Sequence, residues 1–140
     1  MDCVIRKVTS NDAEALFALV EKFARSFRPA RESFEVSLGH LLSDQTAWLR
    51  LAAFEGQVVG YCLGSDHCAF YANGRVSWVE EIMVDPAFRR RGVGRALMGA
   101  FESWARSRGS KCVGLATRRA APFYRAIGYE ESAVYFRKVL

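Results

Sequence analysis

The sequence predicts an α/β (α+β) fold built on a mixed sheet, and three observations support this prediction. Half of the residues (51%) are hydrophobic and only three are proline, which is typical of a chain that folds around one core. Apolar runs of strand length alternate with longer runs of helical periodicity. The 140 residues contain no internal repeat and no low-complexity linker, so we expect a single domain over residues 1–140.

The N-terminal third predicts a strand followed by two helices. Residues 3–9 (CVIRKVT) are typical of a short strand. Asn11 can cap a helix with Glu14 three residues later, and apolar residues then recur on one helical face until the break before Pro29. Ser33 is expected to cap the second helix, whose apolar positions are again in helical phase.

The middle of the chain predicts three strands. Residues 47–64 hold two apolar runs on either side of EGQ (55–57), a pattern that indicates a β-hairpin. Residues 66–75 are expected to form a loop that ends in an Asn-Gly turn. Residues 76–84 (VSWVEEIMV) are strand-like apart from their two acids, and the Asp-Pro pair at 85–86 ends the strand.

The C-terminal part predicts a helix, a strand, a second helix and a last strand. The expected elements are a helix that begins at Val93 and stops at Gly109, a strand at 112–117, a small helix at 121–128 and a final strand at 133–139. The complete order is therefore β-α-α-β-β-β-α-β-α-β.

The composition argues against several classes of protein. The four cysteines form no Cys-x-x-Cys pair and do not stand at ligand spacing from a histidine, so we expect neither a metal site nor a disulfide framework. No apolar run reaches the roughly 18 residues of a membrane span, and the N-terminus lacks the apolar stretch of a signal peptide. These features predict a soluble, cytoplasmic protein with no membrane partner.

The most informative stretch is RRRGVGR (89–95), which lies between a predicted strand and a predicted helix. A helix start exposes free amides and the positive end of the helix dipole, glycines let a phosphate approach the backbone, and arginines add charge-assisted contacts. The net charge of +5 also favours anionic partners. The pattern indicates a pyrophosphate site, although neither the P-loop nor the Rossmann spacing fits it. A tight turn with solvated arginines is the alternative.

Two motifs resemble those of the GCN5-related N-acetyltransferase (GNAT) superfamily. The run RRRGVG (89–94) matches the Arg/Gln-x-x-Gly-x-Gly/Ala signature, and IMVDP (82–86) is similar to the strand and turn that lead into it. Further along, FYRAIGY (123–129) resembles the Phe-Tyr-x-x-x-Gly-Phe/Tyr element of the family. The resemblance covers the element order of the whole chain, and it implies a mostly antiparallel, twisted mixed sheet flanked by helices.

The resemblance also implies an N-acetyltransferase that moves an acetyl group from acetyl-CoA to a primary amine by direct transfer in a ternary complex. Amides of residues 90–95 would hold the pyrophosphate, Ile82 and Val84 would pair with the pantetheine arm, and Met83 would face away from those contacts. The cofactor-binding residues implied by similarity are Ile82, Met83, Val84, Arg89, Arg90, Arg91, Gly92, Val93, Gly94 and Arg95.

Three residues are candidates for proton transfer. Tyr124 resembles the family tyrosine that donates a proton to the departing thiolate, with a core tyrosine as the alternative. An ammonium acceptor must lose a proton, and Glu80 or Glu81 could take it directly or through a water. Strand alternation puts these two acids on opposite faces unless a bulge intervenes. Resemblance to polyamine-type members favours Glu80, and an ion pair or a solvated acid is the alternative for either.

The acceptor is expected to be a small-molecule or peptide amine. Where many members of the family carry asparagine, this chain has Thr117, and Arg118 and Arg119 behind it either reach CoA phosphates or face water. Aromatic and basic residues of the expected acceptor region suit a carboxylate or an aromatic ring; they are Phe27, Arg28, Arg31, Phe34, His67, Phe70, Tyr71, Tyr135 and Phe136. A homodimer is a family-level expectation.

Two other functions remain open at this point. An acyl-CoA-binding sensor without turnover would share the fold, although the candidate Tyr124 and the paired acids argue against it. A basic nucleic-acid-binding module would explain the net charge, but no aromatic RNP-like strand and no zinc-finger spacing is present, so a nucleic-acid partner is not expected.

Overall fold

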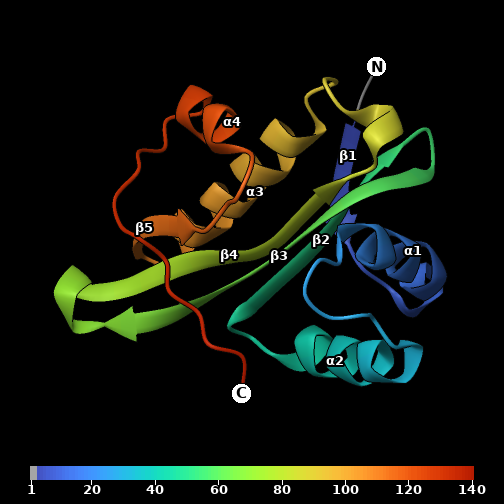
Figure 1. The fold of residues 1–140 in the computed structure, drawn as a ribbon, viewed down its shortest axis with the longest axis horizontal. Helices are drawn as coiled ribbons and strands as arrows, with labels where there is room; N and C mark the ends of the chain where they lie inside the picture. The colour runs from blue at the N-terminus through green and yellow to red at the C-terminus, as the bar shows by residue number, and fades with distance from the viewer. Residues whose placement is uncertain (1–2) are drawn as a thin grey trace.

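The computed structural model describes residues 3–140 and shows one five-stranded sheet with helices on both faces (Figure 1). The strand order is β1-β2-β3-β4-β5; the first four strands are antiparallel, and β5 is parallel to β4. The strands are β1 (Cys3–Lys7), β2 (Ala47–Phe54), β3 (Gln57–Ala69), β4 (Gly74–Val84) and β5 (Ser110–Leu115). The helices are α1 (Ala13–Phe23), α2 (Arg31–Ser43), α3 (Val93–Ser107) and α4 (Ala121–Ala126). The predicted fold class is confirmed.

Both N-terminal helices begin at residues other than those expected. Thr9 and Asp12 form a capping box around a short 3₁₀ turn, and α1 follows at Ala13, so Asn11 is not the cap. Arg6 binds the Asp12 carboxylate with two hydrogen bonds of 2.9 and 2.8 Å, and this pair attaches the start of the helix to β1. Helix α2 already begins at Arg31, two residues before Ser33.

Two hairpins join β2 to β3 and β3 to β4; the first agrees with the prediction, and the second differs from it. The predicted hairpin is confirmed: Glu55 and Gly56 form the two-residue turn between β2 and β3, and both have positive φ, 50° and 82°, as such a turn requires. The predicted loop at 66–75 is wrong for its first half, because β3 continues to Ala69 and pairs with β4 as far as Gly74. The turn itself is short, and Asn73 closes it with a φ of 56°.

The sheet has a separate hydrophobic core on each face. Helix α3 packs on one face through a cluster that includes Leu97, Phe101 and the buried Trp48. Helices α1 and α2 pack on the other face through a cluster that includes Leu16, Leu38 and Tyr61. Since both clusters share the same central strands, β3 and β4 are held from both sides.

Strands β4 and β5 are paired only along the first half of β4, and the chain leaves β4 where β5 ends. Their pairing runs from Arg75 opposite Ser110 to Val79 opposite Leu115, where β5 ends. Residues 80–84 of β4 continue with β3 on one edge only. The divergence leaves an unpaired edge in the middle of the sheet.

The predicted strand at 133–139 is absent. Residues 129–140 form no regular secondary structure, and the segment crosses the strands after leaving α4 (Figure 1). Its side-chain contacts include a stack of Tyr135 on Trp78 with ring centroids 6.4 Å apart and a 2.9 Å hydrogen bond from Arg137 to Ser26. The alternating apolar pattern is present, but a strand also needs a neighbouring backbone to pair with, and the segment runs across the sheet instead.

Candidate active site

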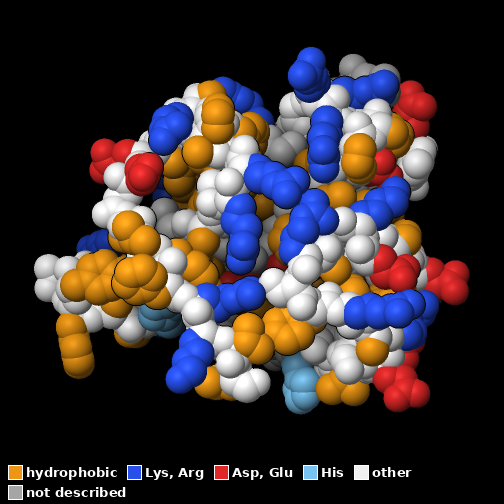
Figure 2. Space-filling model, viewed as in Figure 1, with side chains coloured by type: hydrophobic (Ala, Val, Ile, Leu, Met, Phe, Trp, Pro, Cys, Tyr) orange, Lys and Arg blue, Asp and Glu red, His pale blue; other side chains and the backbone are white. Residues whose placement is uncertain are grey.

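A cavity of about 990 Å³ opens where β4 and β5 diverge. Its walls come from α1 and α2 with their connecting loop, from β4, from the end of β5 and the loop after it, and from the C-terminal segment. Figure 2 shows basic side chains around a hollow in this face, with acidic atoms at its floor. A volume of this size is at the upper end of the range for small-molecule sites.

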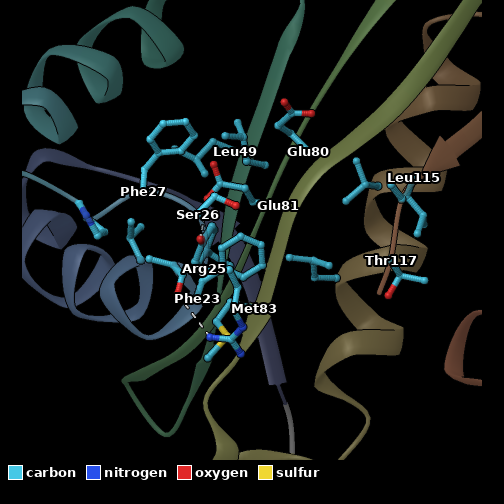
Figure 3. A pocket seen from close by; sticks show the side chains of 18 of the residues that line it. Phe23, Arg25, Ser26, Phe27, Leu49, Glu80, Glu81, Met83, Leu115 and Thr117 are labelled. Atoms are coloured by element: carbon cyan, nitrogen blue, oxygen red, sulfur yellow. Dashed lines mark hydrogen bonds between the residues drawn. The ribbon is translucent and has the colours of Figure 1, made fainter. Parts of the chain in front are cut away.

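A β-bulge puts both candidate acids on the same face of β4. Leu63 pairs with Glu81 and Gly64 pairs with Val79, so Glu80 has no partner on β3. Consistent with this extra residue, Val79 and Ile82 both belong to the α3-side core although three positions separate them. Glu80 and Glu81 therefore both line the cavity, and Figure 3 shows them projecting from β4. Regular strand alternation would place only one of these acids in the cavity; because of the bulge, both are there.

The two acids differ in exposure and in hydrogen bonding. Glu81 is half-buried and accepts a 2.8 Å hydrogen bond from the hydroxyl of Tyr61. Burial, and then the charge of Glu81, raise the pKa of Tyr61 far above its usual value, so this hydroxyl stays protonated and donates. Glu80 is exposed and accepts a 2.9 Å bond from the indole N–H of Trp78. Glu81 is therefore the more enclosed and more firmly positioned carboxylate.

The free edge of β4 presents backbone groups to the gap. The N–H of Asp85 donates to the carbonyl of Val59 on β3 at 2.7 Å. Since backbone groups alternate in direction along a strand, Met83 also points its N–H and C=O toward β3. Those of Ile82 and Val84 point to the opposite, unpaired edge. The side chain of Met83 belongs to the core on the α1 face, and Ile82 and Met83 both line the cavity.

The arginine–glycine run forms the turn before α3. Arg90 and Gly92 both occupy the left-handed region, with φ values of 64° and 81°, and Gly92 is the N-cap of the helix. The first N–H of the helix that bonds back is that of Ala96, to the carbonyl of Gly92 at 3.0 Å. The preceding amides have no partner within the helix and are free to bind an anion. This nest-like turn agrees with the pyrophosphate site that the sequence predicts.

The side chains of this run point in different directions. Arg89 lines the cavity, whereas Arg91 packs over the ring of Phe88, with its guanidinium carbon 5.3 Å from the centroid. Val93 is buried in the core at 1% exposure, so only its backbone is available to a ligand. A Cβ added to Gly94 would lie 3.3 Å from the ring of Phe123, so this glycine keeps α3 and α4 close. Outside the cavity lining are Val84, Arg90, Arg91, Gly92, Val93, Gly94 and Arg95.

Tyr124 lies in α4 on the far side of the gap and lines the cavity. Its side chain is mostly buried and its ring packs edge-to-face against Phe123 and Tyr129. Burial raises the pKa of Tyr124 to about 12, so the phenol is protonated at neutral pH. Within residues 3–140 its hydroxyl has no hydrogen-bond partner, whereas the Tyr129 hydroxyl donates to Glu102 at 2.7 Å. The protonated phenol of Tyr124 can therefore donate a hydrogen bond to a molecule in the cavity.

The expected acceptor residues divide into two groups. Phe27, Phe34 and Tyr135 line the cavity. The others lie outside its lining; they are Arg28, Arg31, His67, Phe70, Tyr71 and Phe136. Phe70 and Tyr71 are exposed at the tip of the β3–β4 hairpin, well away from the divergence of β4 and β5. Thr117, Arg118 and Arg119 do line the cavity, and the Thr117 hydroxyl caps the turn into α4 by accepting from the amide of Ala120 at 3.1 Å.

Several cavity residues were not among the sequence candidates. Tyr61 and Trp78 position the two acids, and Ser26 and Arg137 meet across the cavity opening. Arg25 also lines the cavity, where its guanidinium folds back to the carbonyl of Ala24 at 3.3 Å (Figure 3). These residues come from distant parts of the chain, so sequence spacing gave no signal for them.

Residues 3–140 contain no group of three or more His, Cys, Asp or Glu side chains arranged to hold a metal ion. None of the helices in the same range has the length and apolarity needed to cross a bilayer.

Comparison with known proteins agrees with this geometry. Residues 13–129 match the model of the acetyltransferase (GNAT) family. An aminoalkylphosphonate N-acetyltransferase of Salmonella typhimurium is 29% identical over 99% of this chain and 92% of its own. The crystal structure of glucosamine-6-phosphate N-acetyltransferase from Arabidopsis thaliana has a TM-score of 0.87 at 19% identity, with 99% of both chains covered. An aminoglycoside N-acetyltransferase crystallised with CoA has a TM-score of 0.84 at 20% identity, with 98% of this chain and 95% of that one covered.

Fold and site together define an α/β domain in which the β4–β5 pairing stops halfway along β4, beside a helix start with unbonded amides. The chain belongs to the acetyltransferase (GNAT) family. The resemblance noted in the sequence is confirmed, and so is the predicted enzyme class, an acetyl-CoA-dependent N-acetyltransferase.

Proposed function

We propose that this protein transfers the acetyl group of acetyl-CoA directly to a primary amine while both substrates are bound. The observation that supports this most strongly is the gap between β4 and β5, which opens beside free helix amides at one end and paired acids at the other. An amide-containing arm can add to the unpaired edge of β4 as a strand would. The solved relative with bound CoA has the same fold, which supports CoA as the occupant.

The turn before α3 supplies the phosphate site. The amides of residues 93–95 bind the pyrophosphate at the positive end of a 15-residue helix, and the space beside Gly92 is open, since a Cβ built there would meet no atom within 4 Å. Arg89 adds charge from the cavity wall. Backbone groups of Ile82 and Val84 hold the pantetheine arm, which places the thioester between Glu81 and Tyr124.

Transfer requires the acceptor to lose a proton and the sulfur to gain one. An alkyl ammonium has a pKa near 10.4, so only about one molecule in a thousand is neutral at pH 7. Glu81 accepts this proton, directly or through a water, and Tyr61 keeps its carboxylate oriented. The amine nitrogen then bonds to the acetyl carbon, the carbon–sulfur bond breaks, and Tyr124 donates to the departing sulfur. The proton lost by the amine balances the one gained by the thiol.

The acceptor is a small molecule or peptide with a primary amine. The named relatives act on aminoalkylphosphonates and on aminoglycosides, both of which carry such amines. Aromatic rings of Phe27 and Tyr135 at the opening suit the apolar part of an acceptor.

Two measurements test the proposal. Mass spectrometry of the purified protein should detect bound CoA species, and a thiol-release assay with acetyl-CoA should respond to at least one amine of a broad panel. Binding of acetyl-CoA without release for any amine would favour a non-catalytic sensor and contradict the proposed reaction. RNA binding that weakens steeply with salt, without CoA binding, would favour the nucleic-acid alternative.

Replacing Tyr124 by phenylalanine separates chemistry from binding. Tyr124→Phe should lower kcat about a hundredfold, as expected for loss of a general acid, while acetyl-CoA affinity and unfolding temperature stay near wild type. The matched control is Tyr129→Phe, which removes a hydroxyl that donates to Glu102 and does not line the cavity. Equal kcat for Tyr124→Phe and wild type would remove this residue from the mechanism.

A further inference from the structure

The C-terminal segment closes one side of the cavity through two contacts. Tyr135 stacks on Trp78 at an interplanar angle of 21°, and Trp78 in turn donates to Glu80. Two residues later, Arg137 donates to the hydroxyl of Ser26 in the loop between α1 and α2 at 2.9 Å. Both Tyr135 and Arg137 line the cavity. The segment therefore brings a guanidinium to the side of the cavity that also holds the acids.

The arginines of the cavity have no acidic partners. Five arginines line it, namely Arg25, Arg89, Arg118, Arg119 and Arg137. None of them has a carboxylate oxygen within 4.0 Å in the part of the chain that the structure describes. The two glutamates of the cavity accept bonds from Tyr61 and Trp78 instead. The cavity thus has an excess of positive charge that no residue of the described chain neutralises.

These arginines stand on different walls. Arg89 precedes α3, and Arg118 and Arg119 follow β5, so all three lie on the side of the proposed phosphate and pantetheine sites. Arg137 is held by the α1–α2 loop on the opposite side, where Phe27 also lines the cavity. One hydroxyl satisfies only one of the five N–H donors of a guanidinium. The remaining donors of Arg137 suit an oxyanion that belongs to the second substrate.

We infer that the acceptor is an amine that carries an anionic group, and that Arg137, positioned by Ser26, binds this anion while Glu81 receives the ammonium. This inference rests on the proposed acetyl transfer. The chemical class is a short amino acid, aminophosphonate or amino phosphate, whose two charges match the opposite charges of Arg137 and Glu81. Cationic polyamines lack a group for Arg137 and would be repelled by the surrounding arginines.

A matched series of acceptors tests the inference. The four compounds share an aminoethyl group and differ only in its substituent: 2-aminoethylphosphonate, β-alanine, ethanolamine and ethylenediamine. We expect kcat/KM for the phosphonate or the carboxylate to exceed that for ethanolamine by at least about tenfold, as a charge-assisted hydrogen bond implies. The comparison of phosphonate with carboxylate identifies the preferred anion.

The variant Arg137→Gln tests whether Arg137 is responsible for the preference for anionic acceptors. Arg137 is exposed, so this change should leave folding intact. We expect it to reduce kcat/KM about tenfold to a hundredfold for the anionic acceptors only, with the KM for acetyl-CoA and the rate with ethanolamine unchanged. Arg137→Lys should retain part of the preference. The matched control, Arg106→Gln, removes an exposed arginine of α3 that lies outside the cavity and should change none of these values.

The outcomes separate the inference from the proposed function. Thiol release with ethanolamine or ethylenediamine that is as fast as with the anionic members would overturn the anionic acceptor and leave acetyl transfer standing. Retention of the full preference by Arg137→Gln would overturn the role of Arg137. Absence of release with every amine of the broad panel would overturn acetyl transfer, and this inference with it.

Discussion

The two ends of the β4–β5 pair use arginine in opposite ways. At the closed end, where the strands are paired, Arg75 and Arg108 both bind the Asp66 carboxylate, whose side chain is fully buried. At the open end, five arginines line the cavity without a carboxylate partner among residues 3–140. The same residue type therefore joins β3, β4 and α3 at one end and is left available for a ligand at the other.

The difference separates stability from binding along one pair of strands. The closed end contributes to the fold because three hydrogen bonds to Asp66 are made before any substrate arrives. The open end keeps unpaired backbone groups and unpaired guanidinium groups, which only a bound anion can satisfy. Substitutions at the closed end should change stability and leave specificity alone, and substitutions at the open end should do the reverse.

The largest effect is expected from Asp66→Asn at the closed end. This change leaves two arginines without their buried acid, so the free energy of unfolding should fall by about 3 kcal/mol, measured by urea denaturation. The hydrogen bond from Arg108, and then that from Arg75, hold the pKa of Asp66 below its ordinary value near 3.8.

The depressed pKa of Asp66 predicts how the free energy of unfolding depends on pH. Because the folded pKa of Asp66 is depressed, its contribution is present above about pH 4 and lost as the pH falls below that value. Asp66→Asn should therefore show less acid destabilisation than wild type, with kcat per folded molecule unchanged. A large loss of kcat in the folded variant would show that the two ends are not independent.

The next effect is expected from the paired acids at the open end. Glu81→Gln should lower kcat/KM about a hundredfold, since the half-buried carboxylate is the proposed base. Glu80→Gln should cost roughly less than tenfold, because Glu80 is exposed at the opening. The reverse order would assign the base to Glu80, and no effect from either would leave the role to another group. Neither change should alter stability as Asp66→Asn does.

The smallest effect is expected from Gly92→Ala in the turn before α3. A Cβ at this position meets no protein atom within 4 Å, so the change disturbs the turn only through its φ of 81°. The strain of placing a side chain in this left-handed conformation is about 1 kcal/mol. We expect the KM for acetyl-CoA to rise about threefold to tenfold, measured by steady-state kinetics. The matched control is Gly99→Ala in the middle of α3, where the space is equally open and φ is helical; it should leave this KM unchanged.

Much of the fold follows from local pattern. Periodicity predicts every helix and the first five strands, because each of these elements buries one apolar face. Two predictions about strands are wrong because pairing depends on distant residues. Residues 66–69 look like a loop but find a partner in the first residues of β4, and residues 133–139 look like a strand but find none.

The residues of the candidate site also divide into those that a local motif predicts and those that depend on distant contacts. The arginine–glycine turn, Tyr124 and the two acids stand in short motifs, so their residue types and spacing are enough to select them. Tyr61, Ser26 and Arg137 carry no local signal, because their value comes from contacts across the sheet and across the cavity. Arg137 stands directly beside Lys138, so the sequence alone does not single it out.

Because Glu80 has no partner on β3, the number of residues in β4 determines how many carboxylates line the cavity. A deletion of this residue would restore an uninterrupted ladder with β3, so the sheet itself has no need of it. Trp78 and Val79 would keep their faces, because Val79 and Glu81 would then alternate normally, and the cleft would retain a single acid. Insertions and deletions are usually tolerated in loops; here, a change of one residue inside a strand would decide how many carboxylates meet the substrate.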